Sequence, residues 1–429
     1  MKNSSLFTVF MVVFIGLMGF SFVIPILPFY ALEYGANELM LGLLLSSYAV
    51  AQLFGAPILG RLSDQYGRRP VLLLSAFGTF VSLLMFAFAQ SLAVLFLSRI
   101  LDGLTGGNIS VAQAYITDIT DEENRSKGLG LLGAAFGLGF IIGPALGGIL
   151  SGLGESTVNP AIAEGGMTFL QQFDWKYTLP GLAAAIIGFI NVLQIIFTLP
   201  ESLTQERRAE IVDSKKGVPQ RSIFSMTAIW EATKRPLVGP LLNMRLFFGM
   251  AFSMFQTAFP LYAAIQLGLG VTETAFVLTY VGVLSVIIQG YGVGKLSQRY
   301  DDKTLLLMSS VMMSVSLIGW GLSFSVPVLL VVLIPISLSG GIFNTVISSA
   351  LTKAATRQES GSILGVGASM ESITRVIAPV LGNSLIAFGA WLPGIVGGVM
   401  TGLTSIYVYQ RIFKADYDKP KNDLGTAEL

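Results

Sequence analysis

The chain has 429 residues, of which 53% are apolar and only 12% are charged. Soluble domains carry about 25% charged residues, so this composition and the mean hydropathy of +0.72 predict an integral membrane protein. The net charge of +1 argues against a polyanion-binding surface, and we expect no nucleic-acid partner. The chain has no cysteine and no histidine, which excludes disulfides, thiol catalysis and imidazole proton relays. We expect no metal and no cofactor, and any proton chemistry must use carboxylates.

Twelve apolar segments are long enough to cross a bilayer, because a span needs about 20 residues at about 1.5 Å each. In the first half of the chain the predicted spans are 6–29, 39–60, 71–90, 92–117, 127–151 and 177–200. In the second half they are 239–266, 273–295, 303–324, 326–350, 361–387 and 390–412. The first segment continues for about 24 residues without a small-residue cleavage site, so we predict a span there and not a signal peptide.

Basic residues gather in the loops on one side of the predicted membrane. They are Arg61, Arg68, Arg69, Arg125, Lys127, Lys295, Arg299 and Lys303, with more in segment 201–238 and in the C-terminal tail. The opposite loops contain only Lys176 as a basic residue, against several acids. Because lysine and arginine favour short cytoplasmic loops, we expect both termini to be cytoplasmic in an inner or plasma membrane. The long opposite loop, 152–176, has no predicted role.

The chain contains an internal repeat. The turn GRLSDQYGRRPVLLL, which starts at Gly60, returns as GKLSQRYDDKTLLL from Gly294, 234 residues later. The glycine pair 106–107 recurs at 340–341, and GPALGG from Gly143 recurs as APVLGN from Ala378. A parallel duplication of a block of spans is typical of two-lobed transporters. We expect an N-terminal lobe at 1–200, a polar cytoplasmic linker at 201–238 and a C-terminal lobe at 239–429.

These residues carry a resemblance to a known family. The loop motif from Gly60 to Arg69, the span 4 run RILDGLTGG, the run AYITDITDEENRSKGLG from Ala114 and the span 5 pattern GxxxGPxxGG resemble the major facilitator superfamily. Within it, the chain is most similar to the twelve-span drug:proton antiporters of the tetracycline-exporter-like branch. The resemblance covers nearly the whole chain and implies an all-α membrane protein with twelve transmembrane helices in two six-helix lobes.

The loop motif has two interpretations. Its arginines can simply fix the topology, whereas the resemblance implies a gate at the turn between spans 2 and 3. In that gate, Asp64 and an arginine connect the turn to Asp118 and to the other lobe. The implied gating residues are Gly60, Asp64, Gly67, Arg68, Arg69 and Asp118. In the second copy, Gln298 replaces Asp64, so we expect an asymmetric gate.

The span 5 pattern forms a ridge of small residues with one proline. Its members are Gly139, Gly143, Pro144, Gly147 and Gly148. Such a ridge permits close helix approach, which is ordinary packing in many membrane bundles. The resemblance associates this motif with export.

Ionisable side chains inside spans are costly and usually functional. Arg99 and Asp102 lie near the middle of span 4 at i, i+3 spacing, and Glu371 and Arg375 lie near the middle of span 11 at i, i+4 spacing. Asp102 and Glu371 are therefore the candidate proton carriers, with Arg99 and Arg375 as charge partners. Each pair can instead be a static bridge that stabilises the fold. The resemblance places both pairs beside a central cavity, and we expect Arg245 to snorkel to the membrane surface.

Polar side chains within the spans are the candidate contacts for a substrate. They are Gln52, Asn108, Gln113, Asn243, Gln256, Gln289 and Asn344. Tetracycline exporters resemble one another in carrying an acidic residue in span 1, whereas this chain has Gly19, Phe20 and Ser21 in that region. The resemblance therefore does not extend to tetracycline itself.

The function expected from these features is exchange of protons for an amphipathic drug-like compound or metabolite by alternating access, in a protein that acts as a monomer. One alternative is a facilitator or uptake transporter of a small metabolite that does not use protons, and another is a transporter-like receptor. We expect no enzymatic activity, because the chain shows no nucleophile and base constellation and no GxxxxGK[ST] loop for ATP.

Overall fold

The computed structural model describes residues 3–106, 108–165, 168–214, 226–356 and 359–413. In the first half of the chain the helices are α1 (Asn3–Glu33), α2 (Glu38–Tyr66), α3 (Arg68–Ala87), α4 (Leu92–Thr105), α5 (Asn108–Ile119), α6 (Glu122–Leu153), α7 (Asn159–Glu164) and α8 (Trp175–Thr198). Then follow α9 (Gln205–Ser214), α10 (Met226–Lys234), α11 (Val238–Leu267), α12 (Val271–Ile287), α13 (Val293–Arg299), α14 (Asp302–Gly321), α15 (Val326–Ala354), α16 (Ser360–Ile386) and α17 (Leu392–Val408). Short π-helical or 3₁₀ turns are η1 (Gly154–Val158), η2 (Leu170–Gln172), η3 (Ile288–Gly292) and η4 (Tyr409–Phe413).

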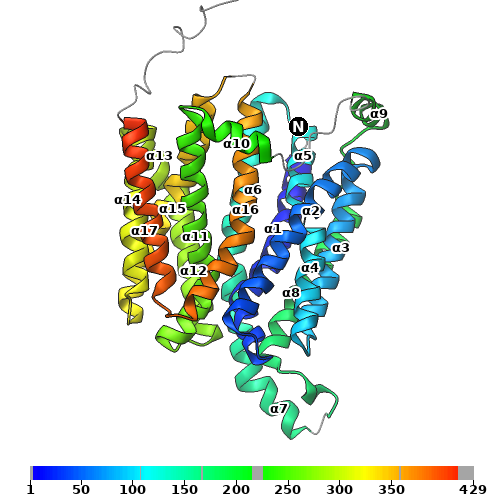
Figure 1. The fold of residues 1–429 in the computed structure, drawn as a ribbon. Helices are drawn as coiled ribbons and strands as arrows, with labels where there is room; N and C mark the ends of the chain where they lie inside the picture. Colours follow the sequence, from blue (N-terminus) through cyan, green and yellow to red (C-terminus); the bar gives the residue numbers. More distant parts are fainter. Residues whose placement is uncertain (1–2, 107, 166–167, 215–225, 357–358, 414–429) are drawn as a thin grey trace, which may run out of the picture.

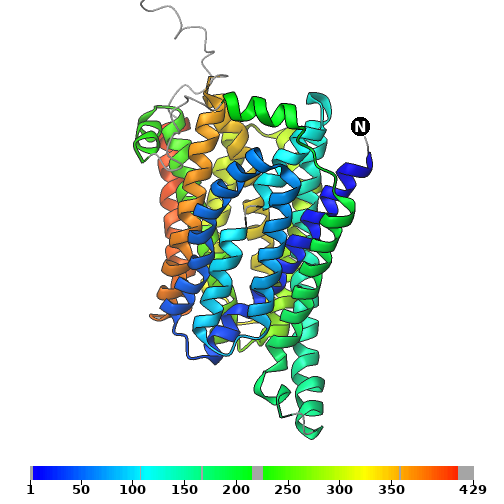
Figure 2. The same cartoon turned by 90° about the vertical axis from the view of Figure 1, so that its right-hand side faces the viewer.

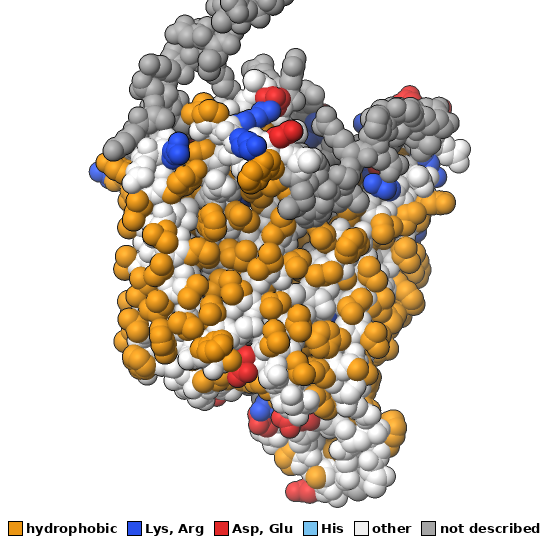
Figure 3. Space-filling model, in the orientation of Figure 1, with side chains coloured by type: hydrophobic (Ala, Val, Ile, Leu, Met, Phe, Trp, Pro, Cys, Tyr) orange, Lys and Arg blue, Asp and Glu red, His pale blue; other side chains and the backbone are white. Residues whose placement is uncertain are grey.

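Within the described residues, twelve helical segments are long and apolar enough to cross a membrane, which confirms the predicted number. They stand side by side as two groups of six, from α1 to α8 and from α11 to η4 (Figure 1). Apolar side chains cover the middle of the face shown in Figure 3, and charged side chains gather toward its two ends. This distribution is the one that a bilayer requires.

The predicted loop 152–176 differs from the structure, whereas predicted span 4 agrees with it. Span 4 is described as α4 up to Thr105 and α5 from Asn108, which together form one candidate span that ends at Ile119. Span 5 continues past Ser151 through η1 and α7 to Glu164, so part of the predicted loop 152–176 is helical and projects from the bundle (Figure 2). The polar sequence after Ser151 hid this extension, since hydropathy marks the membrane and not the end of a helix.

The N-terminus, α9 and α10 lie at one end of the bundle, which we call the N-terminal face, and α7 lies beyond the other end, the opposite face (Figure 1). Local chemistry fixes the helix ends. The side chain of Asn37 accepts a hydrogen bond from the Met40 amide at 2.9 Å, and Asp121 accepts from the Asn124 amide at 2.9 Å. Gly67, with φ 107°, makes the sharp turn between α2 and α3.

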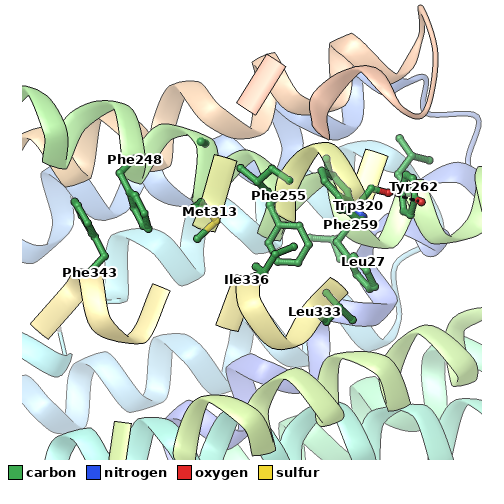
Figure 4. Packing of buried hydrophobic residues seen from close by; sticks show 14 of the residues in the cluster. Leu27, Phe248, Phe255, Phe259, Tyr262, Met313, Trp320, Leu333, Ile336 and Phe343 are labelled. Atoms are coloured by element: carbon green, nitrogen blue, oxygen red, sulfur yellow. Dashed lines mark hydrogen bonds between the residues drawn. The ribbon is translucent and has the colours of Figure 1, made fainter. Parts of the chain in front are cut away.

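The largest core cluster joins the two lobes. Phe248 and Phe343 stack with ring centroids 3.7 Å apart, and Phe255 meets Trp320 edge to face at 5.0 Å. Figure 4 shows that Leu27 of α1 lies beside Phe259 and Leu333 of the second lobe. Because Leu27 is near the end of α1, this contact lies toward the opposite face.

Direct contacts between the lobes concentrate in the half of the membrane near the opposite face. The hydroxyl of Ser46 on α2 donates to the Val376 carbonyl of α16 at 2.6 Å. Thr272 of α12 donates to the Gly148 carbonyl of α6 at 3.1 Å. A Cβ atom on Gly42 would lie 2.7 Å from the Pro379 carbonyl oxygen, so small residues permit this close approach.

The same helices have open surfaces toward the N-terminal face. Gly130 and Gly133 lie one to two turns before Gly137, on the side of α6 by which Gly137 approaches α12. On α16, Gly365 lies three turns before Val376, on the side that meets α2. A Cβ atom on Gly130, Gly133 or Gly365 would meet nothing within 4 Å. The lobes are therefore closed together near the opposite face and stand apart toward the N-terminal face.

Candidate functional site

Glu371 of α16 is held between two arginines from different helices. Its Oε1 atom accepts from Nη2 of Arg375 at 2.6 Å, and its Oε2 atom accepts from Nη2 of Arg245 on α11 at 3.0 Å. The sequence predicted the first pair from its i, i+4 spacing. The expectation that Arg245 snorkels to the surface is wrong, because its guanidinium extends along α16 to Glu371 and passes Gly367, where any side chain would crowd it.

This triad lies at the closed end of the opening between the lobes. Arg375 directly precedes Val376, which receives the hydrogen bond from Ser46 in the closed half. The Arg375 side chain is 59% exposed and that of Glu371 41% exposed, while Arg245 is only 16% exposed. With two guanidinium groups and one carboxylate, the triad has one surplus positive charge, and Arg375 presents it.

Arg99 and Asp102 of α4 pair at 3.3 Å inside the first lobe. Both side chains are only 3% exposed. The Arg99 guanidinium lies over the ring of Phe86 on α3, 5.5 Å from its centroid. The hydroxyls of Thr79 and Ser82 on α3 lie beside the Asp102 carboxylate. The resemblance implied a place beside the central cavity, whereas this conformation buries the pair against α3.

Tyr48 of α2 lies between the two charge groups. A Cβ atom on Gly103, next to Asp102, would collide with the Tyr48 carbonyl oxygen, and Ser46, two residues before Tyr48, donates to the carbonyl of Val376, next to Arg375. Nε2 of Gln52 donates to the Tyr48 hydroxyl and to the Gly106 carbonyl, both at 3.0 Å. Tyr48 and Gln52 therefore separate the pair of the first lobe from the triad of the second, and only Gln52 was predicted.

The other substrate candidates are scattered. Gln113, Gln256, Gln289 and Asn344 are exposed on α5, α11, η3 and α15. Asn243 faces α17, where its amide nitrogen lies 3.5 Å from the Tyr407 hydroxyl. Asn108 begins α5, but its side chain is outside the described part of the structure. Gln113 is thus exposed, whereas Asp102 of the same span is buried.

The loop motif forms a compact network at the N-terminal face. Nη1 of Arg68 donates to Asp64 at 2.6 Å and to Ser63 at 2.7 Å, and its Nε donates to Asp118 at 3.0 Å. Asp118 also accepts from the Ser202 hydroxyl at 3.2 Å. The predicted contact with Asp118 is therefore present. Among the described residues, the side-chain hydrogen bonds of Arg68 stay within the first lobe.

Glu201, which sequence reasoning missed, completes this network. Its carboxylate accepts from the backbone amides of Arg68 at 2.9 Å and Arg69 at 3.2 Å, at the start of α3. Nη2 of Arg69 donates to the Ile196 carbonyl at 2.5 Å. A Cβ atom on Gly67 would collide with Glu201, whereas one on Gly60 would meet nothing within 4 Å. The position of Glu201 directly after an apolar span was the available signal.

The second copy of the turn reverses the charges of the first. Asp302 starts α14 as Arg68 starts α3, and both helices have 20 residues. Lys353 near the end of α15 corresponds to Asp118 near the end of α5. Nζ of Lys353 lies 2.7 Å from Asp302 Oδ2. The pairing between the two helices thus persists in both lobes with opposite polarity.

The glycine ridge of α6 faces two partners. Gly139, Gly143 and Gly147 pack against α1, where a Cβ atom on Gly143 would collide with the Ser21 hydroxyl. Ser21 donates to the Gly139 carbonyl at 2.7 Å. Gly148 instead faces Ala275 of α12 in the other lobe. Pro144 lies within α6, which remains helical through it. The ridge therefore joins α1 to the interface between the lobes.

Comparison with known proteins assigns nearly the whole chain to one family. The family model described as Major Facilitator Superfamily matches residues 9–379 and 244–428. The chain belongs to the major facilitator superfamily. Like its relatives in this superfamily, it is a multi-pass membrane transporter of a small molecule and not an enzyme.

Relatives within the superfamily support the tetracycline-exporter-like branch. The class H tetracycline resistance protein of Pasteurella multocida is 29% identical over 421 residues, which cover 95% of this chain and 97% of that protein. Solute carrier family 22 member 18 of Mus musculus is 29% identical over 365 residues, which cover 84% of each chain.

A solved structure shares the superfamily fold. The bacterial homolog to the human lysosomal transporter Spinster, in an inward-facing and occupied conformation, matches with a TM-score of 0.74 at 13% identity. The match covers 95% of this chain and 97% of that one. At this identity the likeness shows the fold alone.

Proposed function

We propose that this major facilitator transporter exports an amphipathic compound in exchange for protons. The observation that carries the proposal is the Glu371 triad, a mid-membrane carboxylate between two arginines at the closed end of the opening. Charged groups at this depth are costly, so those that a membrane protein retains usually serve transport. A carboxylate that loses a guanidinium partner is protonated more easily, so a changed pairing of Glu371 can load or release a proton.

The orientation follows from charge. The basic loops, including Arg61, Arg69 and Lys295, lie at the N-terminal face, so we assign this face and both termini to the cytoplasm of an inner or plasma membrane. The conformation is then inward-facing, ready to receive a compound from the cytoplasm. We divide the chain into lobes at 1–200 and 239–429, with 201–238 as the cytoplasmic linker and the monomer as the working unit.

Asp102 and Glu371 are the two proposed proton carriers, with Arg99 and Arg375 as their charge partners. The deep burial of Asp102 suits a group that is reached only in part of the cycle, while Glu371 faces the opening now. The Arg68 network acts as the gate. It stabilises the open N-terminal face by holding α2, α3 and α5 together, and it releases when the lobes close there.

Tetracycline resistance is named for the relatives, and we do not propose tetracycline as the substrate of this chain. Span 1 of this chain has no acidic residue near Gly19, Phe20 or Ser21, and Ser21 is occupied by its contact with α6. We therefore expect another amphipathic compound.

The test is substrate-driven proton movement in proteoliposomes with an imposed pH gradient, across a panel of amphipathic drugs and metabolites. We compare the unmodified protein with Asp102→Asn, Glu371→Gln and the control Glu206→Gln on the exposed helix α9. Exchange predicts proton flux that is lost in at least one of the first two variants and kept in the control. Substrate flux without proton flux in the unmodified protein would refute the exchange mechanism.

That result would favour a facilitator or uptake transporter. The complete burial of the Arg99–Asp102 pair is the observation that favours this second candidate, because a buried pair can be purely structural. Absence of all flux in sealed vesicles would favour a receptor.

A further inference from the structure

We propose that the substrate is an amphipathic organic anion whose charged group binds Arg375. This inference names the substrate class for the proposed transport function and rests on it. It follows from the balance of charge at the centre of the protein, the open donors of one arginine and the apolar surface beside it.

The charge balance comes first. Three arginines and two carboxylates lie around mid-membrane on α4, α11 and α16, and the Arg99–Asp102 pair among them is buried against α3. Asp102 pairs with Arg99, and Glu371 must serve both Arg245 and Arg375. One positive charge therefore has no counter-charge among the described residues. An uncompensated charge at this depth is unfavourable, and an entering anion would relieve it.

Arg375 is the group that presents this charge. Within the described part of the chain, its guanidinium donates only to Glu371, through one Nη2 hydrogen, although a guanidinium has five N–H donors. Arg245 is mostly covered and lies against Gly367. The exposed edge of Arg375 is therefore free for a carboxylate or sulfonate, which can bind two parallel N–H groups.

An aromatic surface lies next to this charge. The ring of Phe20 is 5.1 Å from that of Tyr48 and 6.4 Å from that of Phe140, which stacks on Phe136 at 6.3 Å. Tyr48 lies two residues beyond Ser46, whose hydroxyl donates to the carbonyl of Val376, next to Arg375. The Phe20 ring is tilted against Tyr48 and meets Phe140 edge to face, so the centre offers aromatic walls for a ring system and a cation for its acidic substituent, which is the pattern of an amphipathic anion.

A cationic substrate fits the same centre poorly. Glu371 is already neutralised by two arginines, and Asp102 is only 3% exposed and paired with Arg99. A cation would have to displace a guanidinium to reach either carboxylate, and it would add to the existing positive charge. Like charges in a low-dielectric interior repel strongly.

The inference predicts effects of opposite sign at neighbouring residues. The anion and Glu371 compete for Arg375, so Glu371→Gln removes a competitor and should strengthen anion binding. Arg375→Gln should weaken it by about tenfold, the effect of losing a charge-assisted hydrogen bond.

The experiment measures equilibrium binding to the purified full chain, with binding to empty micelles subtracted. The probes are 1-anilinonaphthalene-8-sulfonate, the uncharged N-phenyl-1-naphthylamine, which has the same ring skeleton without the sulfonate, and the cation ethidium. The variants are Arg375→Gln, Arg375→Lys, Glu371→Gln and the control Lys295→Gln, an exposed basic residue of α13.

We expect the sulfonate to bind at least tenfold more tightly than the uncharged probe. This preference should be lost in Arg375→Gln, kept largely in Arg375→Lys and increased in Glu371→Gln. Equal binding of the sulfonate and the uncharged probe by the unmodified protein, or stronger binding of ethidium, would overturn the inference whether or not the variants fold. Proton-coupled flux of ethidium alone would overturn this inference and leave the proposed transport function standing. Sulfonate binding without flux of any probe would leave the inference standing and overturn the proposed transport function.

Discussion

The two charge-reversed pairs at the N-terminal face allow a matched measurement of what burial does to an ion pair. Arg68 and Asp118 have side chains that are 7% and 9% exposed, whereas Lys353 and Asp302 are 63% and 21% exposed. The two pairs join equivalent helices at similar distances, 3.0 and 2.7 Å. Their main difference is therefore access to solvent.

We predict a coupling energy of about 2 kcal/mol for the buried pair, because removal of one partner leaves a covered charge without compensation. In the Asp118→Asn variant Arg68 still pairs with Asp64. We therefore expect a coupling energy below the largest values found for buried pairs. For the exposed pair we predict about 0.5 kcal/mol or less, since water and salt screen it.

The assay is a double-mutant cycle for each pair. Arg68→Gln and Asp118→Asn are measured singly and together, as are Lys353→Gln and Asp302→Asn, by reversible unfolding in mixed micelles followed by tryptophan fluorescence. High salt should reduce the second coupling energy more than the first. Equal coupling energies for the two pairs, or a larger one for Lys353 and Asp302, would refute the argument from burial.

Two further predictions concern the helix contacts. Gly143→Ala should lower the midpoint of thermal unfolding, because the added Cβ atom collides with Ser21. Adding Ser21→Gly should restore part of the loss, and the control Gly133→Ala on the same helix should not lower the midpoint. An unchanged midpoint in Gly143→Ala would contradict the close packing. The hydrogen bonds from Arg235 hold the pKa of Glu359 below its usual range. The Arg235–Glu359 ion pair, which links the end of α10 to the start of α16, should therefore be fully formed at pH values above the usual glutamate pKa and lost as the pH falls through the lowered pKa. Hydrogen exchange of α10 should then increase at acid pH in the unmodified protein and be high at all pH values in Glu359→Gln; equal exchange in both proteins at neutral pH would contradict it.

The spans were predictable because a bilayer imposes one length and one polarity on every helix that crosses it. All twelve predicted segments overlap the helices of the structure, and the pair Glu371–Arg375 followed from helical spacing alone. The family could also be named from sequence, since its motifs occupy short continuous runs such as Gly60 to Arg69.

The missed features depend on contacts between distant parts of the chain. Arg245 and Glu371 are 126 residues apart, so nothing local indicated that Arg245 turns inward. The same holds for Glu201, which lies 133 residues from Arg68 in the chain and reaches its amide in space. The burial of the Arg99–Asp102 pair depends on its packing against α3, where Phe86 lies under the Arg99 guanidinium. Sequence periodicity shows which residues share a helix face and not which helix covers that face.

The reversed polarity of the second turn also bears on how the protein can close at its N-terminal face. Arg68 is equivalent to Asp302, and Asp118 to Lys353. The helices that begin at Arg68 and Asp302, α3 and α14, lie on opposite sides of the bundle (Figure 1), so each ion pair stays within its own lobe. The two turns therefore present opposite arrangements of charge to whatever approaches them, and one kind of charged partner cannot serve both when the entrance narrows.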